Sequence, residues 1–148
     1  MQRIGDVAHA TGLTPRAIRY YEELGLLAPA VHTSGGNRRY DDGEVQRLLL
    51  IKRLREDVGL SLSDIKTYLD IEEVRRALKS EYAAAADPNV QLVLLDRIEP
   101  IIRRRIALLD RKLEAVAALR GEDEAILERI ASLRIHHLNR ASLAAAGA

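Results

Sequence analysis

Apolar positions recur every three or four residues along most of this 148-residue chain, and turn residues divide them into separate helical segments. The first segment places Ile4, Val7 and Thr11 on one side of a short helix, which Gly12 ends. A second short helix follows after a turn of a few residues. This arrangement is typical of a helix-turn-helix, although it also fits an ordinary helical hairpin.

The second helix has two different sides. Thr14 is a good N-cap, Pro15 suits the first helical position, and Gly25 can adopt the left-handed conformation that ends a helix. The inner positions are Ala17, Ile18, Tyr21 and Leu24. The outer positions are Arg16, Arg19 and Tyr20. A short helix with outward Arg and Tyr side chains can enter the major groove of DNA.

A hairpin is predicted directly after this helix. Ser34 to Asn37 have the composition of a hairpin tip, and Arg38, Arg39 and Tyr40 lie on the returning arm. A basic hairpin beside a recognition helix can lie along the DNA backbone as a wing. The pattern therefore predicts a winged helix-turn-helix head.

Two more helices complete the predicted head, residues 1–70. Asp41 or Asp42 caps a third helix that ends near Gly59, and Ser61 caps a fourth.

The start of the fourth helix is a candidate second wing. Ser63 and Lys66 lie there and are available to phosphate groups. A solvated helix face explains Lys66 equally well.

Residues 88–120 are predicted to form a dimerisation helix, which Asp87 caps and Pro88 begins. Apolar residues recur along it in near-heptad spacing, as in the seam of a coiled coil. The seam consists of Leu95, Ile98, Ile102, Ile106, Leu109, Leu113 and Val116. Burial is worth about 1.5–3 kcal/mol for each of these side chains, so a homodimer is expected. A helix of this length, about 50 Å, can hold two heads one turn of DNA apart.

The segments around this helix are less regular. Residues 71–87 are expected to form a short connecting helix and linker, and Pro100 should kink or split the long helix, with a kink favoured because the apolar register continues. Gly121 should end it, and residues 121–148 should form another amphipathic helix and a frayed tail. His136 and His137 are adjacent and face different directions on a helix, which favours a structural or exposed role over metal binding.

Composition excludes several classes of function. The chain has no Cys, hence no disulfide or thiolate metal site, and it shows no pattern of a catalytic residue, a metal ion or a cofactor site. Residues 1–70 contain ten Lys or Arg and ten Asp or Glu, so DNA binding would depend on a local Arg cluster. No apolar run is long enough for a membrane span and the start lacks a signal-peptide pattern, so a cytoplasmic protein without a membrane partner is expected.

Residues 3–70 resemble the MerR family of bacterial transcription regulators. The resemblance rests on I-G-D-V-A-x-x-T-G-L-T-x-R-A-I-R-Y-Y-E-E-L-G-L-L, on N-R-R-Y in the hairpin and on G-L-S-L-S-D-I before the fourth helix. It implies a mainly α fold, with a winged helix-turn-helix head, a small β-hairpin wing and a long antiparallel coiled-coil dimerisation helix. It also implies a homodimer that binds a pseudo-palindrome in double-stranded promoter DNA, distorts it and acts there with RNA polymerase, in many members in response to an effector.

The resemblance also assigns roles to individual residues. The family's recognition-helix contacts fall on Thr14, Arg16, Arg19 and Tyr20. The wing motif falls on Asn37, Arg38, Arg39 and Tyr40. Arg38 and Tyr40 match residues that hold the DNA backbone, whereas Arg39 lies where other members vary. Tyr21 is expected to pack inward, and Pro15 replaces a polar residue that is common in the family.

Two alternatives stay open. A head with no net charge also fits a coiled-coil protein–protein adaptor, and a chain without Cys also fits an architectural DNA-binding protein with no effector response. Metal- and oxidant-sensing members of the family generally use Cys, and drug-sensing members carry a large C-terminal ligand domain. The sequence therefore does not identify a small-molecule effector, and it does not separate activation from repression.

Overall fold

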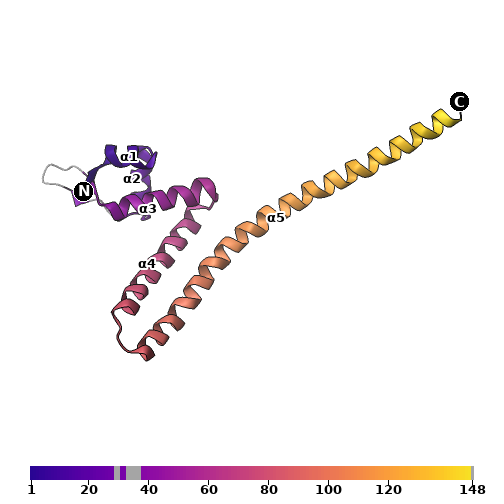
Figure 1. Cartoon of the computed structure of the whole chain (residues 1–148). Coiled ribbons are helices and arrows are strands. Elements are labelled where there is room, and N and C mark those ends of the chain that lie inside the picture. Colours follow the sequence, from indigo (N-terminus) through magenta and orange to yellow (C-terminus); the bar gives the residue numbers. More distant parts are fainter. Residues whose placement is uncertain (29–30, 33–37, 148) are drawn as a thin grey trace. The chain divides into compact units, whose positions relative to one another are not determined.

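The computed structural model describes residues 1–28, 31–32 and 38–147 (Figure 1). The chain divides into two units, Met1–Ile106 and Ala107–Ala148. The first unit contains the head and a helical hairpin. The second unit is the later part of the last helix.

The two helices of the predicted helix-turn-helix are present. They are α1 (Ile4–Thr11) and α2 (Pro15–Glu23). Gly12 and Gly25 follow them with a φ of 68°, a left-handed conformation that glycine adopts without strain. Thr14 caps α2, since its Oγ1 accepts a hydrogen bond from the backbone N–H of Ala17 at 3.1 Å. The caps that the sequence predicted therefore set the ends of both helices.

A three-stranded antiparallel sheet lies beside these helices. Its strands are β1 (Gln2–Arg3), β2 (Val31–His32) and β3 (Arg38–Tyr40), in the order β1–β3–β2. The pairing of β2 with β3 confirms the predicted hairpin arms, while its tip lies outside the described residues. Strand β1 was not predicted, because two residues are too few to show an alternating pattern.

The rest of the head consists of α3 (Asp42–Lys52), a π-helical turn η1 (Arg53–Asp57) and the first half of α4 (Leu62–Ala84). Asp41 and Glu44 form a reciprocal capping box at the start of α3, with distances of 2.8 and 2.7 Å. The core of the head is aliphatic apart from two Tyr. Its most deeply buried side chains are Val7, Ile18, Leu26, Tyr40, Leu48, Ile51, Ile65 and Leu69.

A lysine links α3 to the end of α1. Lys52 Nζ donates a hydrogen bond to the Thr11 carbonyl at 3.0 Å. A cation at a helix C-terminus also interacts favourably with the helix dipole. Lys52 thus fixes the turn before α2.

The structure corrects two predictions about the later helices. α4 is a single helix that passes through the expected boundary at residue 70, so the separate connecting helix in residues 71–87 is wrong. α5 (Pro88–Ala146) begins at the predicted Asp87 cap but does not end at Gly121. Pro100 does not split it, in line with the favoured alternative, because the interrupted hydrogen bond is one of many along a long helix. A helix-interior Gly costs only about 0.5–1 kcal/mol relative to Ala, so Gly121 alone does not stop α5.

Within the first unit, α4 and the beginning of α5 form an antiparallel helical hairpin (Figure 1). Ile71, Leu78 and Leu94 are buried in it. Glu72 joins the two helices, since its carboxylate pairs with Arg105 at 2.6 Å. Hydrogen bonding from Arg75, followed by that from Arg105, lowers the pKa of Glu72. The sequence had not predicted that this part of α5 packs against α4 of its own chain.

The second unit is helical from Ala107 to Ala146. It exposes many large apolar side chains, from Leu113 to Leu143. Even so, none of the described helices combines the length and the apolar composition that crossing a membrane requires.

Candidate nucleic-acid interface

The outer side of α2 carries the predicted recognition residues. Ile18 and Tyr21 are buried against the head, as expected, and burial raises the pKa of the Tyr21 phenol. Arg16 and Arg19 are exposed, and 48% of Tyr20 is accessible. The helix therefore turns its apolar side inward and keeps its two guanidinium groups at the surface.

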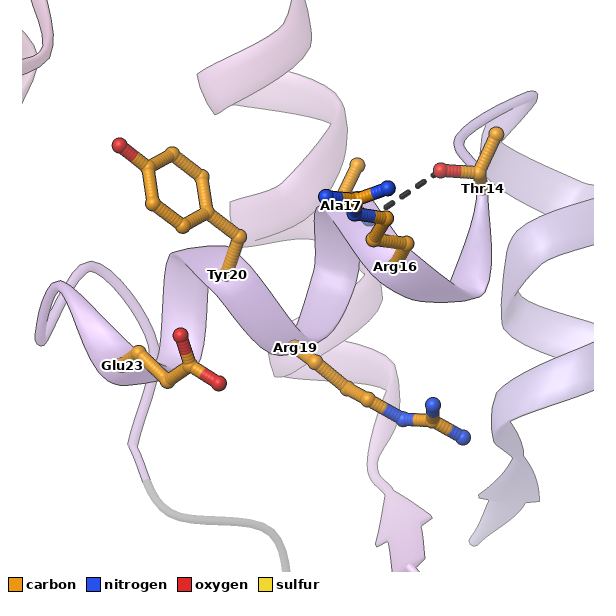
Figure 2. Close-up of a pocket in the computed structure, with 6 residues that line it drawn as sticks. All are labelled: Thr14, Arg16, Ala17, Arg19, Tyr20 and Glu23. Atoms are coloured by element: carbon orange, nitrogen blue, oxygen red, sulfur yellow. Dashed lines mark hydrogen bonds between the residues drawn. The ribbon is translucent and has the colours of Figure 1, made fainter.

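These side chains surround an open depression of about 540 Å³ (Figure 2). It is lined by Thr14, Arg16, Ala17, Arg19, Tyr20 and Glu23. Figure 2 shows the Arg19 side chain extending away from the helix and the Tyr20 ring directed to the other side. Within the part of the chain that the structure describes, neither Arg16 nor Arg19 forms an ion pair with a carboxylate. Both guanidinium groups can thus donate to phosphate oxygens or to guanine.

The wing contains a correction to the prediction for Tyr40. Its side chain is fully buried, and its hydroxyl donates a hydrogen bond to Glu22 Oε1 at 2.9 Å. Burial, together with this hydrogen bond, raises the pKa of Tyr40 strongly. Tyr40 therefore belongs to the core of the head, and its hydroxyl is not available to a DNA phosphate in this structure.

Arg38 is held by the same carboxylate. Its Nη1 lies 3.3 Å from Glu22 Oε2, and 37% of the Arg38 side chain is exposed against 8% for Glu22. Glu22 on α2 thus binds two residues of β3 at once, which fixes the wing strand against the recognition helix. Arg38 keeps enough exposed surface to meet a phosphate as well.

Sequence reasoning missed Glu22, although a signal was present. Glu22 lies four residues after the buried Ile18, and residues four apart share a face of a helix. A carboxylate at an inward position requires a donor, and the nearby basic wing offers one. The spacing could therefore have identified Glu22 as a partner of the hairpin.

The remaining wing candidates are Arg39 and Asn37. Arg39 is partly exposed on β3, where it pairs with Arg3 of β1 and with Val31 of β2 in the strand register. Asn37 lies outside the described residues.

The candidate second wing lies at the start of α4. Ser63 and Lys66 are exposed there. Lys66 lies near the turn that follows α2, because a Cβ built on Gly25 would be 4.0 Å from its ammonium nitrogen. Lys66 is therefore close enough to the end of the recognition helix to extend its basic surface.

The predicted dimer seam is accessible. Leu95, Ile106, Leu113 and Val116 are each about half exposed or more. Ile98, Ile102 and Leu109 are partly exposed. Because Leu94 and not Leu95 is buried within the chain, the packing inside the first unit leaves the predicted seam uncovered at this position.

The described residues contain no group of three or more His, Cys, Asp and Glu side chains arranged to hold a metal ion. His136 and His137 contact each other edge to face at the second unit's surface.

Comparisons with known proteins agree with the arrangement of the head. Residues 2–72 match the family model for MerR HTH family regulatory proteins. The chain is 34% identical over 115 residues to the HTH-type transcriptional regulator ZntR homolog of Haemophilus influenzae, a match that covers 78% of this chain and 84% of the relative. It is 27% identical to the HTH-type transcriptional regulator YfmP of Bacillus subtilis over 86% of this chain and 96% of that one.

Among solved structures, the chain is similar to HiNmlR, a MerR family regulator lacking the sensor domain, bound to promoter DNA. The TM-score is 0.46, with 26% identity and coverage of 76% of this chain and 78% of the other. The sequence matches extend from the head into α5, well beyond a single short motif. The chain therefore belongs to the MerR family of helix-turn-helix transcription regulators.

Proposed function

We propose that this regulator works as a homodimer that binds a pseudo-palindromic operator in promoter DNA. Thr14, Arg16, Arg19 and Tyr20 of each protomer would face the major groove, and Arg38 and Arg39 would contact the backbone beside it. The observation that carries the proposal is the outer side of α2, where two guanidinium groups and a Tyr are exposed next to a basic strand. Such a surface fits a duplex groove.

The dimer is supported by the exposed seam from Leu95 to Val116. Each head alone reads only one half-site, whereas two heads about 34 Å apart match successive turns of one face of the duplex. Two relatives that align with most of this chain are named HTH-type transcriptional regulators, which supports a role in transcription. Acting at a promoter would bring the protein beside RNA polymerase in the cytoplasm, and distortion of the promoter would be its means of regulation.

Binding titrations of Arg19→Ala test the groove contact. The DNA is the region upstream of the gene that encodes this chain. If Arg19 reads a base, the free energy of binding to the specific site weakens by about 1–3 kcal/mol, while binding to unrelated DNA changes little. Arg76→Ala is the matched control, because Arg76 is an exposed arginine on α4 away from the head's basic surface. Equal binding by the parent chain and Arg19→Ala would remove Arg19 from the interface.

A gel shift with the intact chain tests the function as a whole. Heparin retention and binding to duplex DNA at low salt are expected, with an affinity that falls as salt rises. A chain that ignores duplex DNA of every sequence, yet still forms a homodimer, would favour a protein–protein adaptor instead.

A further inference from the structure

The second unit carries an apolar surface that nothing in that unit covers. We call Leu119, Ile126, Ile130 and Leu133 the C-terminal stripe. Their exposed fractions are 64, 57, 46 and 51%. A helix with an apolar stripe on one side is stable when a second element buries that stripe.

The stripe has the spacing of a coiled-coil seam. Leu119, Asp123, Ile126, Ile130, Leu133 and His137 follow one another at intervals of four, three, four, three and four residues. At about 100° per residue, these positions form one narrow band, and Ile135 lies on nearly the opposite side of the helix. A band of this kind fits one helix of equal length, and the exposed Leu127 and Leu138 lie on an adjacent side of the helix.

The charges beside the stripe indicate the direction of that helix. Residues 119–124 carry Arg120, Glu122, Asp123 and Glu124, a net charge of −2, and Arg120 pairs with Glu124 at 3.2 Å. Residues 134–140 carry Arg134 and Arg140, a net charge of +2 with both His neutral. A parallel second copy would place like charges together, whereas an antiparallel copy places the acidic end of each helix beside the basic end of the other.

We propose that residues 119–140 of α5 pair antiparallel with the same residues of a second copy of this chain. The pairing is centred close to Ile130, so the apolar middle of each stripe packs on the other and the charged ends complement each other. This contact goes beyond the proposed function, which uses only the seam from Leu95 to Val116. Two protomers that the seam joins antiparallel have C-terminal ends that point in opposite directions. The two C-terminal stripes of one dimer therefore cannot pair with each other, and each stripe joins its dimer to another dimer.

Crosslinking at single cysteines tests the pairing, because the native chain has no Cys. In Ile130→Cys the two thiols lie near the symmetry axis, so a short bis-maleimide is expected to couple two chains at least fivefold more efficiently than in Ile135→Cys. Ile135 is the matched control, since it is an exposed isoleucine of the same helix on the other side. Equal crosslinking at the two positions would overturn the proposal.

A third variant separates this contact from the proposed dimer. Ile106 lies at the middle of the predicted seam, so Ile106→Cys reports that seam alone. Coupling at position 106 without coupling at position 130 would leave the dimer intact and refute the C-terminal contact. Coupling at 130 without coupling at 106 would support the C-terminal contact and contradict the dimer seam.

The mass of the assembly gives a second readout. Light scattering of the full chain is expected to show species larger than a dimer that increase with concentration. Ile130→Asp should reduce them to the dimer, while Ile135→Asp should not. An Ile130→Asp chain of unchanged mass would overturn the proposal.

Discussion

At the scale of single residues, the most informative side chain in the head is Glu22. Its carboxylate is nearly buried and lies between the Tyr40 hydroxyl and the Arg38 guanidinium. A buried carboxylate that loses a charged partner costs about 1–3 kcal/mol. Arg38 therefore has two separable tasks, which are to neutralise Glu22 and to contact a DNA phosphate.

A pair of variants separates these tasks. Arg38→Gln should lower the free energy of unfolding by about 1–3 kcal/mol, since Glu22 keeps its burial and loses its ion pair. Arg38→Gln combined with Glu22→Gln should recover most of that stability, because the buried charge is removed. Urea unfolding measures this recovery.

DNA binding should not recover in the same double variant. Affinity for all sequences should stay reduced, and the slope of log affinity against log salt should stay about one unit shallower than in the parent chain. If binding returned together with stability, Arg38 would have only its structural task.

Two glycines of the head offer a matched comparison of stability. Gly12 has a φ of 68°, and a Cβ there would lie 2.8 Å from Lys52 Nζ, whereas nothing lies within 4 Å of a Cβ at Gly5 in α1. Gly12→Ala should therefore destabilise the head by about 1–2 kcal/mol. Gly5→Ala should leave stability unchanged or raise it by up to about 1 kcal/mol. Thermal or urea unfolding checks both, and equal effects would contradict the role of Gly12 as a helix end.

At the scale of elements, Glu72 connects α4 with α5. It accepts hydrogen bonds from Arg75 and Arg105, which hold its pKa below the ordinary value of 4.5. Because the folded state has the lower pKa, the ion pair contributes its full stability above pH 4.5, and that contribution is lost as the pH falls through the folded pKa. Acid should therefore loosen this hairpin.

Unfolding titrations at several pH values between 7 and 3 check this expectation. Glu72→Gln should cost about 1–3 kcal/mol at neutral pH and should flatten the decline in stability below pH 4.5. Glu99→Gln is the control, because the Glu99–Arg103 pair is exposed and such pairs contribute about 0–1 kcal/mol. A parent chain and Glu72→Gln with parallel profiles would contradict the role of Glu72.

Sequence patterns predicted the elements of the head well and the later helices less well. Thr14, Gly12 and Asp41 are local signals, and local signals set where short helices begin and end. β1 and the inward role of Tyr40 depend on contacts between distant residues, which no local pattern contains. Gly121 was predicted to end α5 because helix ends often carry glycine, but helix formation on both sides of one glycine outweighs its small cost.

At the scale of the whole molecule, the predicted dimer makes stability depend on concentration. A species that binds itself only when folded gains about 1.4 kcal/mol for each tenfold rise in concentration. That gain is shared by the two protomers of a dimer, so for chains of this size the thermal midpoint should rise by about 2–3 °C over that range. Ile106→Asp should abolish most of this rise, and Ile135→Asp should not. A midpoint that is independent of concentration would mean that the chain folds as a monomer.

The two faces of α2 also have a practical consequence for engineering. Ile18, Tyr21 and Glu22 hold the helix in the head, while Arg16, Arg19 and Tyr20 project from it without contributing to the core. The projecting triplet can therefore be randomised in a combinatorial library while the scaffold stays constant. Selection from such a library would yield heads with new target preferences, and their folding would not have to be redesigned each time.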